Sequence, residues 1–330
     1  MLEKTFYKYR TDSVFTEQII TSGQIYLSTA EGLNDPFECS LQDLNRKWFE
    51  KKIIELKQAA VFGFVIEARR AIKDNLYFFG LTPAETVQML EDIREKDTDK
   101  AFSCRQMIMK AHTGYAPAEP DRLFVQLNQQ LLDVGIFSMS ANPGHQLMWA
   151  HYGGEHTGLC LGFKNVIESK LSNPDHFLPV IYSDQLPEMQ EGFNVEMAFS
   201  MNENGVLYTS SYKIAFADKT FQKAITTKPT CWQYEEEWRY VEPYPGLFTW
   251  PGPLSGITFG LKCRSERRHY YIDLVETHIP YPVIFFEMRK KHGTNELERV
   301  PFEISASKPK VSALPQKKKC SSRQAKDVCR

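Results

Sequence analysis

Short runs of β-branched and aromatic residues, each bounded by glycine or proline, constrain the fold of this chain most strongly. They occur near the N-terminus and again throughout the part that follows Gly135. Residues of these types favour strands, and glycine and proline mark the turns between strands. Because helical patterns interrupt the runs and do not alternate with them, we predict an α+β fold with a mixed or antiparallel β core. The predicted strands read TFYKYR, QIYLS, GIFSMS, TGLCLGF, PVIYS, EEWRYVE, GITFGL and PVIFFEMR.

Residues 43–134 follow a helical pattern instead. Thr82-Pro83-Ala84-Glu85 has the residues of a capping box, with proline at the first helical position. We therefore predict a single domain over 1–304 with a helical insertion at about 43–134. We also predict a short helix near His145–Tyr152 and a longer one over about Ser211–Thr226. Within the insertion, apolar residues recur every three or four positions at Ile53, Leu56, Ala60, Phe64, Ala68 and Ile72.

A basic tail follows an acidic body. Residues 305–330 carry eight Lys or Arg against one Asp, a net charge of +7, whereas residues 1–304 carry 32 basic and 40 acidic side chains, a net charge of −8. The tail lacks hydrophobic periodicity, so we expect it to be disordered. It is either a solvated chain end or a salt-sensitive contact to nucleic acid, which makes nucleic acid a candidate partner.

Other features of the sequence disfavour several classes of protein. The seven cysteines form no CxxC pair and no Cys/His zinc spacing, which is typical of reduced thiols. The longest apolar run, at about residues 59–66, is far shorter than the ~20 residues of a membrane helix. The first residues form no apolar signal segment, so we expect a cytoplasmic protein without membrane contact. The motifs of P-loop NTPases, Rossmann oxidoreductases, α/β-hydrolases and zinc-helix proteases are absent.

The first predicted strand carries a candidate anion-binding residue. On a strand, Lys8 and Arg10 share one face, and Tyr7 and Tyr9 share the other. Arg10 could clamp a phosphate or carboxylate through two hydrogen bonds, with Tyr9 beside it and the hydroxyl of Ser28 orienting the ligand from the next strand. The alternative is an edge strand whose charges are solvated.

The loop Asn34-Asp35-Pro36-Phe37-Glu38 is a second candidate. Asn and Asp ahead of proline favour a rigid turn through hydrogen bonds from the side chain to the backbone. From such a turn Asn34 and Asp35 could point into a binding site. The alternative is a well-formed turn that Phe37 anchors.

The motif Gln146–Tyr152, in the predicted helix near His145–Tyr152, is a third candidate. Its aromatic side chains Trp149, His151 and Tyr152 could stack on or polarise a ring-bearing ligand. They could equally pack in the core. The histidines in and around this helix lack the regular spacing of a metal-binding helix, so we expect no metal site here.

The segment Glu235-Glu236-Glu237-Trp238-Arg239 is the most informative part of the sequence. If it is a strand, Glu235, Glu237 and Arg239 share one face. Two carboxylates on one face repel each other unless a cation, a shared proton or a ligand offsets their charge. Both acids are therefore candidate catalytic residues. The alternative is a surface strand in which Arg239 pairs with both acids.

Two resemblances follow from these motifs. In order, YKYR, IYLS, NDPFE, LMWAHY before TGLCLGF, and W-x-x-EEEWR resemble a bacterial family known mainly as a domain of unknown function. The chain also resembles ADP-ribosyltransferases of bacterial toxins and phage-defence proteins. Those enzymes have a basic residue or His on an early strand, a Ser or Tyr on a middle strand and a late Glu. Here Arg10, Ser28 and Glu235-x-Glu237 occur in that order, although Ser28 follows Arg10 too closely for the usual middle strand.

The second resemblance implies an ADP-ribosyltransferase-like fold and an enzyme that uses NAD as its substrate without a metal. Glu237 would bind the ribose 2′-OH and stabilise an oxocarbenium-like state, and Glu235 would orient or deprotonate the acceptor. Arg10 would hold the diphosphate and Ser28 the ribose, while an aromatic side chain stacks on nicotinamide. A toxin-like enzyme would also need an inhibitory or activating protein partner.

Two other functions stay open. Asp35, Glu38, Glu235 and Glu237 could hold Mg²⁺ in a nuclease or phosphoesterase, with Lys228 near the scissile phosphate. The same pocket could instead belong to a non-enzymatic module that senses a nucleotide or nucleic acid. Replacing Glu237 by Gln separates enzyme from sensor, and metal dependence separates nuclease from transferase.

Overall fold

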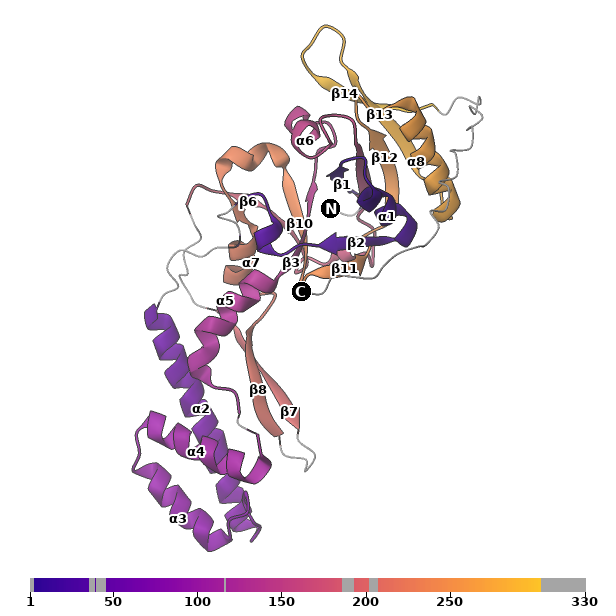
Figure 1. The fold of residues 1–330 in the computed structure, drawn as a ribbon. Coiled ribbons are helices and arrows are strands. Elements are labelled where there is room, and N and C mark those ends of the chain that lie inside the picture. The colour runs from indigo at the N-terminus through magenta and orange to yellow at the C-terminus, as the bar shows by residue number, and fades with distance from the viewer. Residues whose placement is uncertain are drawn as a thin grey trace, which may run out of the picture.

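The computed structural model describes residues 3–35, 39, 46–115, 117–185, 193–201 and 207–303. Its centre is an eight-stranded sheet with the strand order β14-β13-β12-β4-β1-β3-β10-β5. Strands β12 and β13 pair in parallel, and the other neighbours in this sheet pair antiparallel. Helices occur between the strands without regular alternation (Figure 1). The predicted α+β class with a mixed sheet is therefore confirmed.

The order of the strands in space differs from their order in the sequence. β1 lies between β3 and β4, and β10 lies between β3 and β5. The strands of this sheet are β1 (Thr5–Arg10), β3 (Gly135–Ser140), β4 (Leu159–Lys164), β5 (Phe177–Pro179), β10 (Glu237–Glu242), β12 (Leu254–Phe259), β13 (Ile284–Lys290) and β14 (Leu297–Pro301). Three two-stranded sheets are formed by β2 (Gln24–Leu27) with β11 (Gly246–Thr249), β6 (Ile181–Tyr182) with β9 (Thr227–Lys228), and β7 (Val195–Met201) with β8 (Leu207–Ile214).

Two apolar clusters account for most of the core around the large sheet. One joins the sheet to α1 (Val14–Ser22) and α8 (Ser265–His278), with Phe6, Phe163 and Tyr271 fully buried in it. The other joins β3 and β10 to α5 (Leu123–Asp133) and α7 (Lys219–Thr226). Burial of such side chains at roughly 1.5–3 kcal/mol each is the main favourable term in folding. The sheet is thus fixed by packed side chains around the strands that carry the site.

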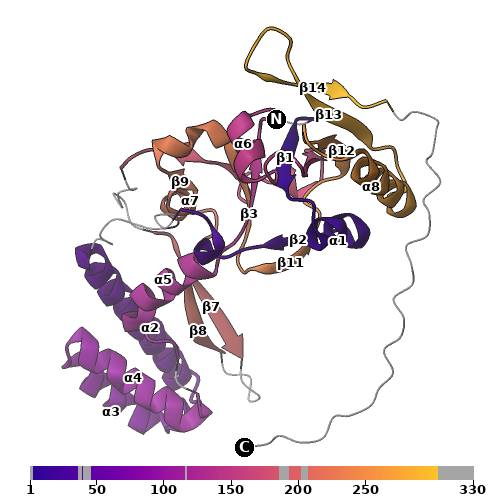
Figure 2. The ribbon, with the colours of Figure 1, turned by 45° about the horizontal axis from the view of Figure 1, so that its top comes forward.

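The described residues of the predicted helical insertion form four α-helices and the 3-10 helix Pro120–Arg122. The α-helices are α2 (Arg46–Lys73), α3 (Pro83–Arg94), α4 (Thr98–Thr113) and α5. In Figures 1 and 2, α2, α3 and α4 extend away from the large sheet, and α5 leads the chain back to β3. The capping box is confirmed at the start of α3, where the Glu85 N–H donates to Thr82 Oγ1 over 3.3 Å and the Thr82 N–H donates to Glu85 Oε2 over 2.8 Å.

The predicted helix over Ser211–Thr226 is wrong in its first half. Residues up to Ile214 belong to β8, which pairs with β7, and α7 begins only at Lys219. The carboxylate of Asp218 accepts hydrogen bonds of 2.9 Å from the N–H groups of Thr220 and Phe221, so this residue caps the helix and separates it from the strand. The helix was predicted because apolar residues at 214, 217, 221 and 224 have helical spacing, but the first of them belongs to the strand.

Two other expectations concern the ends of elements. Ser28 was expected on the strand next to β1, but β2 pairs with β11, and Ser28 forms a backbone bridge with Ile136 of β3. The helix near His145–Tyr152 is confirmed as α6 (Gln146–His151).

Residues 36–38 of the proline loop and the basic tail from residue 305 onward lie outside the described residues. Among the described helices, none combines the length and apolar character that crossing a membrane requires.

Candidate functional site

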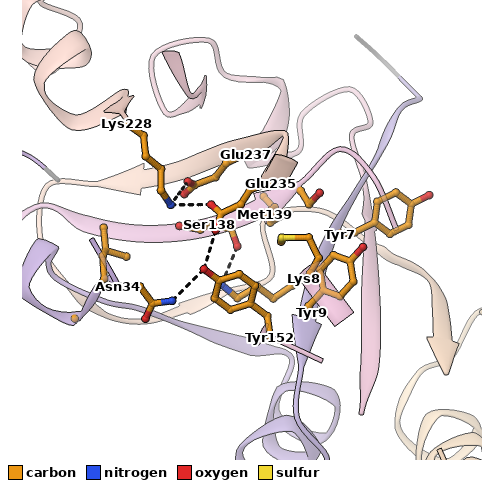
Figure 3. A pocket seen from close by; sticks show the side chains of 14 residues that line it. Tyr7, Lys8, Tyr9, Asn34, Ser138, Met139, Tyr152, Lys228, Glu235 and Glu237 are labelled. Atoms are coloured by element: carbon orange, nitrogen blue, oxygen red, sulfur yellow. Dashed lines mark hydrogen bonds and ion pairs between the residues drawn. The ribbon is translucent and has the colours of Figure 1, made fainter. Parts of the chain in front are cut away.

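A cavity of about 220 Å³ lies beside the neighbouring strands β1, β3 and β10 (Figure 3). It is also bordered by the loop after the short helix Ala30–Gly32, by α6, and by the 3-10 helix Thr230–Glu235. Elements from widely separated parts of the chain thus meet here. The lining residues are Tyr7, Lys8, Tyr9, Gly32, Leu33, Asn34, Ser138, Met139, Ser140, Met148, Tyr152, Lys228, Glu235 and Glu237.

Strand register aligns three of these residues in one row. Tyr7 of β1 is paired with Ser140 of β3, and Ser140 is paired with Glu237 of β10. Directly paired residues on neighbouring strands have their side chains on the same face of a sheet. The three side chains therefore lie on one face of the sheet and border the cavity, although the ring of Tyr7 points away from Glu237 (Figure 3).

A buried cluster of charges forms the floor of the cavity. Lys228 Nζ lies 2.7 Å from Glu235 Oε2 and 3.1 Å from Glu237 Oε2. Arg239 Nε lies 2.9 Å from Glu237 Oε1, and its Nη1 donates to the carbonyl of Ile225 over 2.7 Å. All four charged side chains are at most 5% exposed. Two cations thus balance two carboxylates, as burial in a medium of low dielectric constant requires.

A kink in the backbone brings the two carboxylates together. Glu235 ends the 3-10 helix, and Glu237 begins β10, so the expectation that both lie on one strand is wrong. Glu236 between them has a φ of 45° in the left-handed region, and its side chain accepts a 2.9 Å hydrogen bond from Asn142 Nδ2. Because of this kink, both acids reach the same ammonium group of Lys228.

The pKa values of two charged groups are shifted in the cavity. Burial alone would raise the pKa of Glu237, but Arg239 and Lys228 outweigh it and lower the pKa to about 2. Burial lowers the pKa of Lys8 to about 8, with the charge of Arg10 acting in the same direction and those of Glu237 and Glu235 opposing it. At neutral pH, Glu237 is therefore ionised, and Lys8 is a cation that is close to its titration point.

Tyr152 connects the wall of the cavity to its floor. Its hydroxyl donates to Glu235 Oε1 over 2.7 Å and accepts from Asn34 Nδ2 over 3.1 Å. Burial raises the pKa of Tyr152, and the bond to Glu235 acts in the same direction. The phenol therefore remains a neutral donor. Lys8 Nζ donates to the carbonyl of Ser138 over 2.8 Å, so its ammonium lies against β3 (Figure 3).

Comparison with known proteins gives one match. A family model described as a protein of unknown function (DUF2971) matches residues 148–240. The chain is similar to that family over this segment. No curated protein and no solved structure matches the chain. The expected resemblance to a domain-of-unknown-function family is therefore supported, and the DUF2971 segment includes Tyr152, Lys228, Glu235 and Glu237.

The structure brings several of the sequence-predicted residues together. Tyr9 and Tyr152 line the cavity together with Asn34, Glu235 and Glu237. Of these, Tyr152, Glu235 and Glu237 belong to the DUF2971 segment, whereas Tyr9 and Asn34 lie outside it. The candidate site is therefore wider than the part of the chain that the family model covers.

Other candidates near the N-terminus lie outside the cavity lining. Arg10 ends β1, and its Nε is buried without a hydrogen-bond partner among the described residues. The hydroxyl of Ser28 donates to the carbonyl of Thr29 over 3.2 Å. Asp35 is 5% exposed, and it too is not one of the lining residues.

The remaining aromatic candidates on α6 have different environments. Trp149 is completely buried, and its Nε1 donates to the carbonyl of Pro143 over 3.0 Å. Its ring packs edge-on against Tyr9 at 5.1 Å and therefore supports the cavity from behind. His151 is exposed at the end of the helix, with its ring centre 6.5 Å from that of Tyr234. Neither side chain lines the cavity.

Several lining residues were not among the predicted site residues. Lys8 lies on the same strand as Arg10, and the alternation of faces gave no basis for preferring one cation. Ser138 and Ser140 alternate with apolar residues in GIFSMS, a pattern that could have indicated a polar row on this strand. Lys228 was considered only for a nuclease. In the structure its ammonium occupies the space between the two carboxylates, and no group of three or more His, Cys, Asp or Glu side chains suited to a metal occurs in the described part of the chain.

Proposed function

We propose that this protein cleaves the nicotinamide–ribose bond of NAD and transfers the ADP-ribosyl group to an acceptor. The observation that carries the proposal is the row Tyr7–Ser140–Glu237, in which an ionised carboxylate borders a cavity beside a hydroxyl on the middle strand. The neighbouring Lys8 adds a cation from the early strand. This combination agrees with the early basic residue, middle Ser and late Glu of ADP-ribosyltransferases. In this proposal Lys8 takes the role that the sequence suggested for Arg10, and Ser140 takes the role suggested for Ser28.

The charge of Glu237 suits the chemistry of this bond. When the bond between ribose C1′ and the pyridinium nitrogen breaks, its electron pair goes to nitrogen and nicotinamide leaves as a neutral molecule. Positive charge then develops at C1′ and the ring oxygen of the ribose. A fixed carboxylate stabilises that charge and can accept a hydrogen bond from the 2′-OH. Arg239 and Lys228 hold Glu237 in one orientation, so it needs little reorganisation during the reaction.

The size of the cavity supports binding of one half of the substrate. Pockets that enclose whole drug-sized ligands measure roughly 300–1,000 Å³, whereas this cavity measures about 220 Å³. We infer that the nicotinamide and its ribose enter it and that the adenylate half stays outside. The aromatic rings of Tyr7 and Tyr152 border the space for nicotinamide, and the ammonium of Lys8 offers a charge for the diphosphate.

Glu235 is the candidate base in the second half of the reaction. The acceptor oxygen or nitrogen forms a new bond to C1′ and gives its proton to a carboxylate oxygen of Glu235. Tyr152 and Lys228 hold this carboxylate at the cavity, and the Tyr152 hydroxyl links it to Asn34. With water as the acceptor, the same steps give hydrolysis of NAD.

The experiment is release of nicotinamide from NAD by the purified protein, with and without EDTA. We expect release that does not depend on divalent metal and that Glu237→Gln reduces at least about a hundredfold, because the stabilising charge is lost. Glu242→Gln is the matched control, since Glu242 lies on the same strand but outside the cavity lining. It should leave turnover unchanged.

Glu237→Gln leaves two buried cations with less negative charge and could therefore destabilise the fold. A second variant tests the proposal without this effect. Lys8→Met removes a cation that forms no ion pair with the acids and should raise the KM for NAD more than it lowers kcat. Absence of both NAD binding and nicotinamide release from the folded wild-type protein would overturn the proposal.

A further inference from the structure

A second, larger cavity lies in the helical insertion. It measures about 880 Å³ and is bordered by α2, α4, the segment Tyr77–Phe79 and the β7–β8 hairpin. Its lining shares no residue with the cavity that contains Glu237. Two of the elements that border it, α2 and α4, extend away from the large sheet (Figure 1). Its volume falls within the roughly 300–1,000 Å³ typical of sites for small organic ligands.

The walls of this second cavity are aromatic and aliphatic. Phe64 and Phe79 stack with their ring centres 5.7 Å apart, and Phe78 packs edge-on against both. Tyr77 is 72% exposed at the mouth, and Tyr212 contributes a ring from β8. Such surfaces favour a ligand with a flat or elongated apolar body.

Arg105 of α4 places a buried positive charge in the wall of the second cavity, whose lining also includes the exposed side chains Glu67 and His112. The residue is only 8% exposed, and its Nη1 donates to Gln106 Oε1 over 3.1 Å. Its Nε is buried and has no hydrogen-bond partner in the described part of the chain. Burial lowers the pKa of Arg105, but a guanidinium remains charged at physiological pH. Tyr212 and the Glu119 carboxylate oppose the effect of burial on this pKa, but neither accepts a hydrogen bond from Nε. A buried guanidinium with an unused donor is stabilised by an anion that accepts from it.

Gly63 has no side chain and therefore leaves room for a ligand in the second cavity. It lies within the long helix α2 and lines the cavity, and a Cβ atom added to it would meet nothing within 4 Å. Packing therefore does not require glycine at this position. A glycine inside a helix costs about 1 kcal/mol relative to alanine. The position thus leaves the cavity open at the expense of helix stability.

We propose that the second cavity binds a small amphipathic anion, with an aromatic or aliphatic body between the rings and one anionic group on the Arg105 guanidinium. The chain's own basic tail does not fit this description, because its net charge of +7 would be repelled by Arg105. A carboxylate, sulfonate or phosphate ester with an apolar body does fit. This site is separate from the proposed reaction with NAD and does not depend on it.

The test uses two fluorescent probes that differ by one anionic group. The first is 8-anilinonaphthalene-1-sulfonate, and the second is N-phenyl-1-naphthylamine, which has the same rings without the sulfonate. We expect saturable binding of the sulfonate to the full chain. Arg105→Met should weaken it at least about tenfold, as the loss of a charge-assisted hydrogen bond does, while binding of the neutral probe is unchanged. Arg122→Met, a change at an exposed arginine outside the lining, is the matched control.

Gly63→Leu tests the same cavity without removing Arg105, so its result does not depend on whether Arg105→Met destabilises the protein. Leucine favours the helix and fills the cavity, so the variant should be at least as stable as the wild-type protein and should bind both probes more weakly. Equal affinity of the sulfonate for the wild-type protein and for folded Arg105→Met would overturn the proposal. Unchanged binding of both probes to Gly63→Leu would do so as well.

Discussion

Tyr152 and Glu235 are joined by a hydrogen bond of 2.7 Å, although they are 83 residues apart in the sequence. The same tyrosine oxygen accepts a hydrogen bond from Asn34, so one phenol connects three segments around the cavity. One of these segments follows β2, one ends α6, and one precedes β10. The position of the Glu235 carboxylate therefore depends on the phenol as well as on Lys228.

Tyr152→Phe removes this connection without removing the ring. We expect a loss of stability of about 1 kcal/mol and a roughly tenfold fall in NAD turnover, because Glu235 keeps only its contact with Lys228. Urea unfolding and the rate of nicotinamide release measure the two effects. Tyr26→Phe, at a residue that is 62% exposed, is the control and should change neither. Turnover equal to that of the wild-type protein would exclude a role of this phenol in positioning Glu235.

Arg239→Met should be strongly destabilising. Its guanidinium is fully buried, and its removal leaves Glu237 with one cation fewer and the carbonyl of Ile225 without this donor. The expected cost is about 3–5 kcal/mol, the usual effect of breaking a buried ion pair from one side. The control is Arg289→Met, because Arg289 pairs with Glu287 while 61% of its side chain is exposed. That change should cost no more than about 1 kcal/mol, and similar losses in the two variants would contradict the prediction.

The shifted pKa of Lys8 predicts a pH-dependent stability. The pKa falls from 10.5 to about 8 on folding, so between these values the unfolded chain binds more protons than the folded one. Stability from this residue therefore rises as the pH increases from about 8 to about 10.5, and below about 8 the full unfavourable contribution is present. Urea unfolding of the wild-type protein and of Lys8→Met over this range isolates the effect. A difference between the two that does not vary with pH would show that the shift is absent.

Deletion of residues 305–330 tests the basic tail. The deletion removes a net charge of +7 from the chain. If the tail contacts nucleic acid, affinity for an oligonucleotide should fall, and its dependence on salt concentration should become weaker. Release of nicotinamide from NAD should stay the same. Fluorescence anisotropy at several salt concentrations measures the affinity, and unchanged binding after the deletion would rule out this contact.

Local patterns in the sequence predicted much of the fold. The capping box at Thr82 and the strand that contains Glu237 were both expected, because each depends on neighbouring residues alone. The hairpin of β7 and β8 was missed, since it is stabilised by pairing and by packing against α5. The helix Ser265–His278 was also missed. Its polar and apolar residues show almost no periodicity, although Tyr271 and Val275 are buried.

The candidate site was predictable in its residue types and less so in its arrangement. Repulsion between Glu235 and Glu237 indicated a nearby cation, and Lys228 fulfils that role in addition to Arg239. The left-handed backbone at Glu236 could not be inferred, because glutamate rarely adopts it. Likewise, Lys8 could not be chosen over Arg10 until the neighbours of β1 were known.

The strand order has a consequence for protein synthesis. β1 is made first, yet its neighbour β3 is completed only at Ser140, and the carboxylate that is aligned with Tyr7 across β3 arrives at Glu237. While the ribosome translates the intervening codons, the nascent chain holds the early half of the cavity without its acids. A product that ends before Lys228, whether through a premature stop codon or through proteolysis, therefore lacks all four charged residues of the floor.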